Sequence, residues 1–119
     1  MSTGLQHQNY HNEHFYQIDL YTYGDPEFRP VLIDSMIDNL LELQQELYIS
    51  TMKQDPEVFL RAAHKSKTTL SILDNSELSD IVEELKSLTN RRKRIVIFDV
   101  LCSEVIRYLR EEKDRTELH

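Results

Sequence analysis

The feature that most restricts the fold is the spacing of apolar residues, which recur every three or four positions over most of the chain. Such spacing gathers them on one side of an α-helix, because a helix completes a turn in about 3.6 residues. The clearest run is Ile33, Met36, Leu40, Leu43 and Leu47. With only two glycines and three prolines in 119 residues, the chain has few of the turn residues that a β-sheet protein needs. The sequence therefore predicts an all-α fold.

Aspartate-proline pairs at 25–26 and 55–56 divide this pattern into segments. Each pair combines a helix-capping residue with a proline suited to the first helical position. The first pair predicts a long helix that ends near Met52, with a restart or bend at Pro30 because a proline past the first turn removes a backbone hydrogen bond. The second pair predicts a helix that continues without a break to Leu73.

Two further breaks and one aromatic segment complete the pattern. LDNSEL, residues 73–78, predicts a new helix capped by Asn75 or Ser76, and the last helix follows TNRRKR, residues 89–94. The aromatic segment 15–23 predicts a short extra helix whose tyrosines, Tyr21 and Tyr23 among them, cover one end of the molecule. Short connections between amphipathic helices favour antiparallel neighbours. We therefore expect an up-and-down antiparallel four-helix bundle with a short additional N-terminal helix.

The first 13 residues, MSTGLQHQNYHNE, have too little apolar surface to offset the entropy of ordering. We therefore expect a flexible arm at 1–13 and one helical bundle domain at 14–119. His7, His11 and His14 have the spacing of one helix face and could bind zinc or nickel. Nothing nearby would orient their rings, and no cysteine or clustered carboxylate completes the ligand set, so we expect no metal site.

Charge and cysteine content restrict the class of function. Acidic residues outnumber basic ones 21 to 14, for a formal charge of −7, whereas a nucleic-acid binder needs a basic surface. The single cysteine, Cys102, cannot form an internal disulfide and falls on the core face of the last helix. No apolar run approaches the roughly 20 residues of a membrane span. We expect a cytoplasmic protein without nucleic-acid or membrane partners.

One histidine stands outside the core pattern of segment 59–73. On a helical wheel of about 100° per residue, the core arc of this segment holds Phe59, Ala62, Ala63, Ser66, Leu70 and Leu73. His64 lies outside that arc. The same side of the helix carries Leu60, Lys67, Thr68 and Ser71. An exposed imidazole is a competent nucleophile at neutral pH, and Lys67 could offset the charge of a phosphoryl group. These residues leave open a functional histidine or an incidental surface one.

The stretch AAHKSKTTLSILDNSEL, residues 62–78, resembles the signature of histidine-containing phosphotransfer (HPt) domains. In that signature an alanine precedes the histidine, a lysine follows at the third position, and leucines stand on both sides of a break. The matching residues are Ala63, His64, Lys67, Leu73 and Leu78. GDPEF at 24–28 and KQDPEVFLRAAH at 53–64 are also similar to that family, and the likeness covers roughly residues 18–110.

The resemblance implies a phosphoryl carrier of two-component signal transduction rather than an enzyme. His64 would accept a phosphoryl group from the aspartate of a response-regulator receiver domain and pass it to another receiver, in a relay fed by a hybrid histidine kinase. Lys67 would stabilise the phosphohistidine and Ser71 would orient it. The partner-binding positions would be Leu60, Lys65 and Thr68. The chain itself would need no cofactor, because the receiver holds the Mg²⁺.

Two positions depart from the family pattern. Thr68 stands where members usually carry glycine after the lysine, and Asp74 stands where they commonly carry glycine at the break. A β-branched side chain beside His64 could crowd a docking partner. The sequence therefore leaves an alternative open, in which a degenerate HPt-like bundle acts as a non-phosphorylated protein-binding adaptor.

Overall fold

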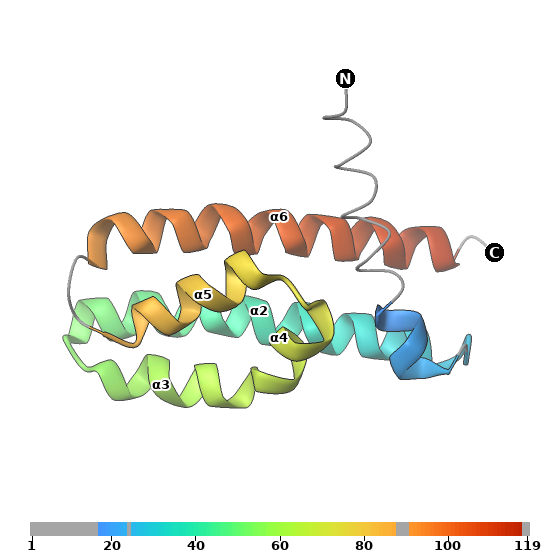
Figure 1. The fold of residues 1–119 in the computed structure, drawn as a ribbon, viewed down its shortest axis with the longest axis horizontal. Helices are drawn as coiled ribbons and strands as arrows, with labels where there is room; N and C mark the ends of the chain where they lie inside the picture. The colour runs from blue at the N-terminus through green and yellow to red at the C-terminus, as the bar shows by residue number, and fades with distance from the viewer. Residues whose placement is uncertain (1–16, 24, 88–90, 118–119) are drawn as a thin grey trace, which may run out of the picture.

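The computed structural model describes residues 17–23, 25–87 and 91–117, and these residues form helices and short connections only (Figure 1). Residues 17–22 are helical. The helices that follow are α2 (Phe28–Lys53), α3 (Pro56–Lys65), α4 (Lys67–Leu73), α5 (Ser76–Leu85) and α6 (Arg91–Glu117). The predicted all-α fold is confirmed for this part of the chain. The arm expected at 1–13 and the histidines at 7, 11 and 14 lie outside the described residues.

The two longest helices, α2 and α6, lie side by side and run in opposite directions (Figure 1). α3 packs against α2, and α5 packs against α6. Between the helices lies one hydrophobic core, in which the ring of Phe59 meets the ring of Phe98 edge-on with 6.3 Å between their centroids. The apolar run predicted for α2 is buried along its whole length, at Ile33, Met36, Leu40, Leu43 and Leu47. The apolar spacing therefore identified the core face of this helix correctly.

The start of α2 explains how the chain accommodates Pro30. The Oδ1 of Asp25 accepts hydrogen bonds from the backbone N–H groups of Glu27 and Phe28, at 2.9 and 3.3 Å. α2 begins at Phe28, so Pro30 falls in the first turn, where a helix does not use the missing N–H. α2 then continues as one helix to Lys53, so of the restart or bend expected at Pro30, the restart is wrong.

Side-chain caps and left-handed residues fix the ends of the shorter helices. Asp55 caps α3 by accepting from the N–H of Glu57 at 3.1 Å, and Asn75 caps α5 by accepting from the N–H of Leu78 at 3.1 Å. Asp74 ends α4 in the left-handed conformation, with φ 50° and ψ 38°. Aspartate and asparagine tolerate this region better than most residues, so Asp74 performs the turn for which glycine is the usual choice.

A break at Ser66 separates α3 from α4, and the continuous helix predicted to reach Leu73 is therefore wrong. The backbone of Ser66 has φ −90° and ψ 6°, and its hydroxyl donates to the backbone carbonyl of Asn39 in α2 at 3.4 Å. The Nδ2 of Asn39 donates to the Oγ1 of Thr69 at 2.7 Å. The chain thus changes direction between His64 and the residues that follow it (Figure 1).

Candidate functional site

His64 lies in the last turn of α3 with an exposed side chain. The core-facing residues of α3 are Phe59, Ala62 and Ala63. His64 falls on the opposite side of the wheel from Phe59, as the helical periodicity predicts. The exposed position predicted for this histidine is confirmed, and its ring can be reached by a molecule from outside.

The ring of His64 lines a groove of ≈ 580 Å³ between α3, α4 and α5. We call it the His64 groove. Its residues from α3 and α4 include Leu60, His64, Lys67 and Ser71. α5 contributes Asp80 and Glu83, and Lys86 follows directly after α5. The structure therefore brings together the predicted phosphoacceptor and the two residues expected to contact a phosphoryl group. It also places Leu60, one of the predicted partner-binding residues, in the same groove.

The His64 groove is lined by one ion pair, by the cation Lys67 and by the carboxylate of Asp80. The Nζ of Lys86 pairs with the Oε2 of Glu83 at 2.7 Å, so these two charges offset each other. No carboxylate of the described residues pairs with the ammonium group of Lys67, which lines the groove and is exposed. A cation without a counter-ion forms charge-assisted hydrogen bonds with an anion that enters. Lys67 can therefore bind a phosphoryl oxygen next to His64.

Lys65 lies on another side of α3. Its Nζ stands 3.1 and 2.9 Å from Oε1 and Oε2 of Glu42 in α2. It lines a separate groove of ≈ 270 Å³ with Glu46 and Arg61. The structure does not bring Lys65 to the His64 groove, although it is the next residue in the chain, because neighbouring residues on a helix differ by about 100° in direction.

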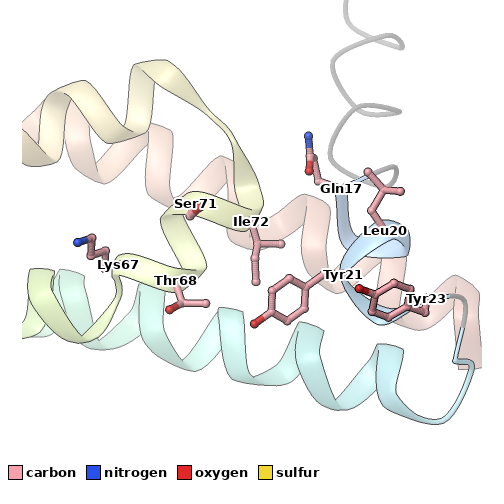
Figure 2. A pocket seen from close by; sticks show the side chains of 8 residues that line it. All are labelled: Gln17, Leu20, Tyr21, Tyr23, Lys67, Thr68, Ser71 and Ile72. Atoms are coloured by element: carbon pink, nitrogen blue, oxygen red, sulfur yellow. The ribbon is translucent and has the colours of Figure 1, made fainter.

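Thr68 belongs to a second hollow, of ≈ 660 Å³, on the other side of α4 (Figure 2). We call it the tyrosine pocket. Its lining residues are Gln17, Leu20, Tyr21, Tyr23, Lys67, Thr68, Ser71 and Ile72. Figure 2 shows Tyr21 extending from the N-terminal helical segment toward Thr68 and Ile72. Lys67 and Ser71 line both hollows, so they form the ridge between the tyrosine pocket and the His64 groove.

The sequence did not predict the tyrosine pocket. Tyr21 and Tyr23 were expected to cover one end of the molecule, but the side chain of Tyr23 is 95% exposed and Tyr21 is 48% exposed. The pocket depends on how residues 17–22 lie against α4, and helical periodicity carries no information about contacts between distant segments. The one available signal was the unusual density of aromatic residues between 15 and 23.

Other candidate chemistry is limited in the described residues. The thiol of Cys102 is fully buried, donates to the backbone carbonyl of Leu40 at 3.6 Å, and has its pKa raised to about 12 by burial and then by the charge of Asp99. Within the described ranges, no three histidine, cysteine, aspartate or glutamate side chains are placed to hold a metal ion. None of the helices in those ranges has both the length and the apolar character needed to cross a membrane.

Comparison of the chain with protein-family models, with curated proteins and with solved structures gives no match. A function is therefore inferred from the chemistry of the His64 groove. There an exposed imidazole, an ammonium group without a counter-ion among the described residues and a hydroxyl group line one hollow. This set of groups suits a nucleophile that receives a negatively charged group.

Proposed function

We propose that the chain is a phosphoryl carrier of the HPt type, with His64 as the acceptor in a phosphorelay. The observation that carries the proposal is the exposed imidazole of His64 in a groove shared with Lys67 and Ser71. The resemblance of residues 62–78 to the HPt signature supports the same assignment. On this proposal α2, α3 with α4, α5 and α6 form the up-and-down four-helix bundle of that family.

The proposed reaction is an in-line displacement at phosphorus. The Nε2 lone pair of His64 attacks the phosphorus of an aspartyl phosphate on a receiver domain, and the bond from phosphorus to the aspartate oxygen breaks as the N–P bond forms. The aspartate leaves as a carboxylate. A Mg²⁺ held by the receiver would supply neutralisation of the charge on the phosphoryl oxygens. The reverse displacement on a second receiver returns the phosphoryl group to an aspartate.

In this reaction the chain contributes electrostatic support from α4. Transfer of the phosphoryl group brings negative charge next to His64, and the ammonium group of Lys67 attracts it. The hydroxyl of Ser71 is available to donate a hydrogen bond to a phosphoryl oxygen. Both residues come from the ridge between the two hollows, so they can act on a phosphoryl group while the partner covers the ring of His64.

The proposed partner is a receiver domain, and the surface around His64 offers it apolar contacts. Leu60 lines the groove beside the histidine, and Leu20 and Tyr21 remain about half exposed beyond the ridge, at 50% and 48%. Exposed apolar side chains beside a reactive group are typical of docking surfaces. Thr68 lines the tyrosine pocket and not the His64 groove, so its methyl group does not narrow the approach to the imidazole from that groove.

The tyrosine pocket favours a second candidate function. At ≈ 660 Å³ against ≈ 580 Å³ it is larger than the His64 groove, and exposed aromatic residues are common anchors in protein interfaces. A non-phosphorylated adaptor would bind its protein partner there, and His64 would then have no chemical role. The two functions differ in whether His64 accepts phosphate.

Chemical phosphorylation tests the proposal without knowledge of the partner. The purified chain is treated with phosphoramidate, and intact mass and site mapping follow. We expect one acid-labile, base-stable phosphate on His64. His64→Gln should abolish it and keep the thermal unfolding curve of the wild type, because the side chain is exposed. His11→Gln serves as the matched control and should label normally.

Two results would contradict the proposed carrier function. A wild-type chain without phosphate on His64, under conditions that label an active HPt domain, contradicts the carrier function and favours the adaptor. A large loss of thermal stability in His64→Gln would contradict the exposed position on which the proposal depends.

A further inference from the structure

Three hydrogen-bonding residues meet where α4 lies against α2. The Nδ2 of Asn39 donates to the Oγ1 of Thr69 at 2.7 Å, and the hydroxyl of Ser66 donates to the backbone carbonyl of Asn39 at 3.4 Å. Ser66 and Thr69 are almost fully buried, at 2% and 3% exposure. We call these three residues the Asn39 clasp. It joins the break at Ser66, and the helix that follows the break, to α2.

The clasp is more directional than ordinary core packing. Burying a hydroxyl is unfavourable unless it is hydrogen-bonded, and an apolar residue in place of Thr69 would fill the same space without that cost. A hydrogen bond depends on angle as well as distance, so the clasp restricts the orientation of α4 relative to α2. α4 has only 7 residues, and a helix this short depends on tertiary contacts for its position.

The orientation of α4 matters to the site because the break divides the site between two helices. His64 belongs to α3, whereas Lys67 and Ser71 belong to α4. In one continuous helix, the i, i+3 spacing alone would fix Lys67 relative to His64. With a break between them, their relative position depends on the angle between α3 and α4.

We infer that Asn39 is a positioning residue for the phosphoryl site. Through the Asn39 clasp it holds the angle at Ser66 that directs Lys67 and Ser71 toward a phosphoryl group on His64. This inference rests on the proposed carrier function. Asn39 itself touches neither the imidazole nor the groove, since the residues that line the His64 groove do not include it.

A double-mutant experiment separates positioning from a general effect on stability. The readout is the half-life of the phosphate on His64 after phosphoramidate is removed, measured with and without Lys67→Ala. The four backgrounds are the wild type, Asn39→Ala, Thr69→Val and Gln44→Ala. Thr69→Val keeps the shape of the side chain and replaces only the hydroxyl with a methyl group. If Asn39→Ala folds poorly, the inference is tested with Thr69→Val alone.

Gln44→Ala is the matched control. Its Nε2 also donates a hydrogen bond from α2 to another helix, to the Oγ of Ser103 in α6 at 3.0 Å, and Gln44 does not line the His64 groove. In the wild type and in Gln44→Ala, we expect Lys67→Ala to shorten the half-life about threefold, the size of an exposed charge interaction. In Asn39→Ala and Thr69→Val the same substitution should leave the half-life unchanged, because Lys67 no longer reaches the phosphate.

The possible outcomes separate the positioning role of Asn39 from the proposed carrier function. If Asn39→Ala and Thr69→Val lower the melting temperature but keep the full threefold effect of Lys67→Ala, the clasp is only structural and the inference is wrong. Residual dipolar couplings of the α3 and α4 amides test the angle without any phosphate, and an unchanged angle in Thr69→Val would also overturn it. A wild type that takes no phosphate on His64 refutes the proposed function itself, and the inference fails with it.

Discussion

Two side chains with nucleophilic atoms, His64 and Cys102, lie in opposite environments. His64 is exposed on the outer side of α3, whereas the thiol of Cys102 is fully buried in α6 beneath α2. Their positions on the helical wheel predict both environments from residue spacing alone. Of these two side chains, His64 is the one whose nucleophilic atom is accessible from outside, which is why the proposed chemistry belongs to it.

The buried thiol makes the stability of the fold depend on pH in the alkaline range. The folded chain holds the Cys102 proton up to a pKa of about 12, whereas an unfolded chain loses it near the ordinary value of 9.0. Above pH 9 the unfolded state therefore binds fewer protons, and the free energy of unfolding falls by about 1.4 kcal/mol for each further pH unit. Urea unfolding between pH 9 and 11 should show a steeper fall for the wild type than for Cys102→Ala. Equal slopes would show that the thiol ionises alike in both states.

Thr68 provides a test of the departure from the family pattern. Its side chain lines the tyrosine pocket, so Thr68→Gly opens no space in the His64 groove. We expect the rate of phosphoramidate labelling to stay at the wild-type value, while the free energy of unfolding falls by up to about 1 kcal/mol because glycine is a poor helix former. Labelling kinetics and a urea titration of the same samples check both statements. Faster labelling would mean that the threonine does restrict access to the imidazole.

At the scale of single helices, the sequence predicted what depends on local periodicity and missed what depends on distant partners. The buried stripe of α2 and the exposed side of α3 follow from residue spacing alone. The break at Ser66 does not, because it is held by Asn39, 27 residues earlier in the chain. For the same reason the sequence could group His64 with Lys67 but could not show that Lys65 pairs with Glu42.

The end of α4 shows how the chain replaces a glycine that the family pattern would place there. Asp74 adopts φ 50° and ψ 38°, a region that costs a side chain with a Cβ roughly 1–2 kcal/mol and glycine almost nothing. Asp74→Gly should therefore raise the free energy of unfolding by about 0.5–1 kcal/mol after the greater entropy of unfolded glycine is deducted. Asp74→Ala is the control and should be less stable than the glycine variant. A glycine variant no more stable than the alanine variant would contradict the left-handed helix end.

At the scale of the whole molecule, Arg29 connects three segments that are distant in the sequence. Its Nε lies 2.7 Å from the Oδ1 of Asp19 in the N-terminal helical segment, and its Nη2 lies 2.5 Å from the Oε2 of Glu112 in α6. Burial acts to lower the pKa of Arg29, but the hydrogen bonds and charges of Asp19 and Glu112 have a larger opposite effect. The pKa of Arg29 is therefore raised above its ordinary value. Arg29 therefore stays charged well above neutral pH, and it holds the segment that forms one wall of the tyrosine pocket.

The two partners of Arg29 should contribute very differently to stability. The side chains of Arg29 and Glu112 are only 12% and 10% exposed, so Arg29→Met leaves a buried carboxylate without its main cation and should cost about 3 kcal/mol. Asp19 is 56% exposed, and Asp19→Asn should cost less than about 1 kcal/mol. Lys113→Met, which breaks the more exposed pair with Asp34 between the same two long helices, is the matched control and should also cost less than about 1 kcal/mol.

Amide hydrogen exchange shows which segments lose stability in Asp19→Asn and in Arg29→Met. Asp19→Asn should speed amide exchange at residues 17–22 and leave the centres of α2 and α6 protected, because only the attachment of that segment is weakened. Arg29→Met should speed exchange in all three segments, since it lowers the stability of the whole fold. If Arg29→Met cost no more than Lys113→Met in a urea titration, Arg29 would be one surface cation among several, and the tyrosine pocket would have to be held by the burial of Ile18 and Thr22 instead.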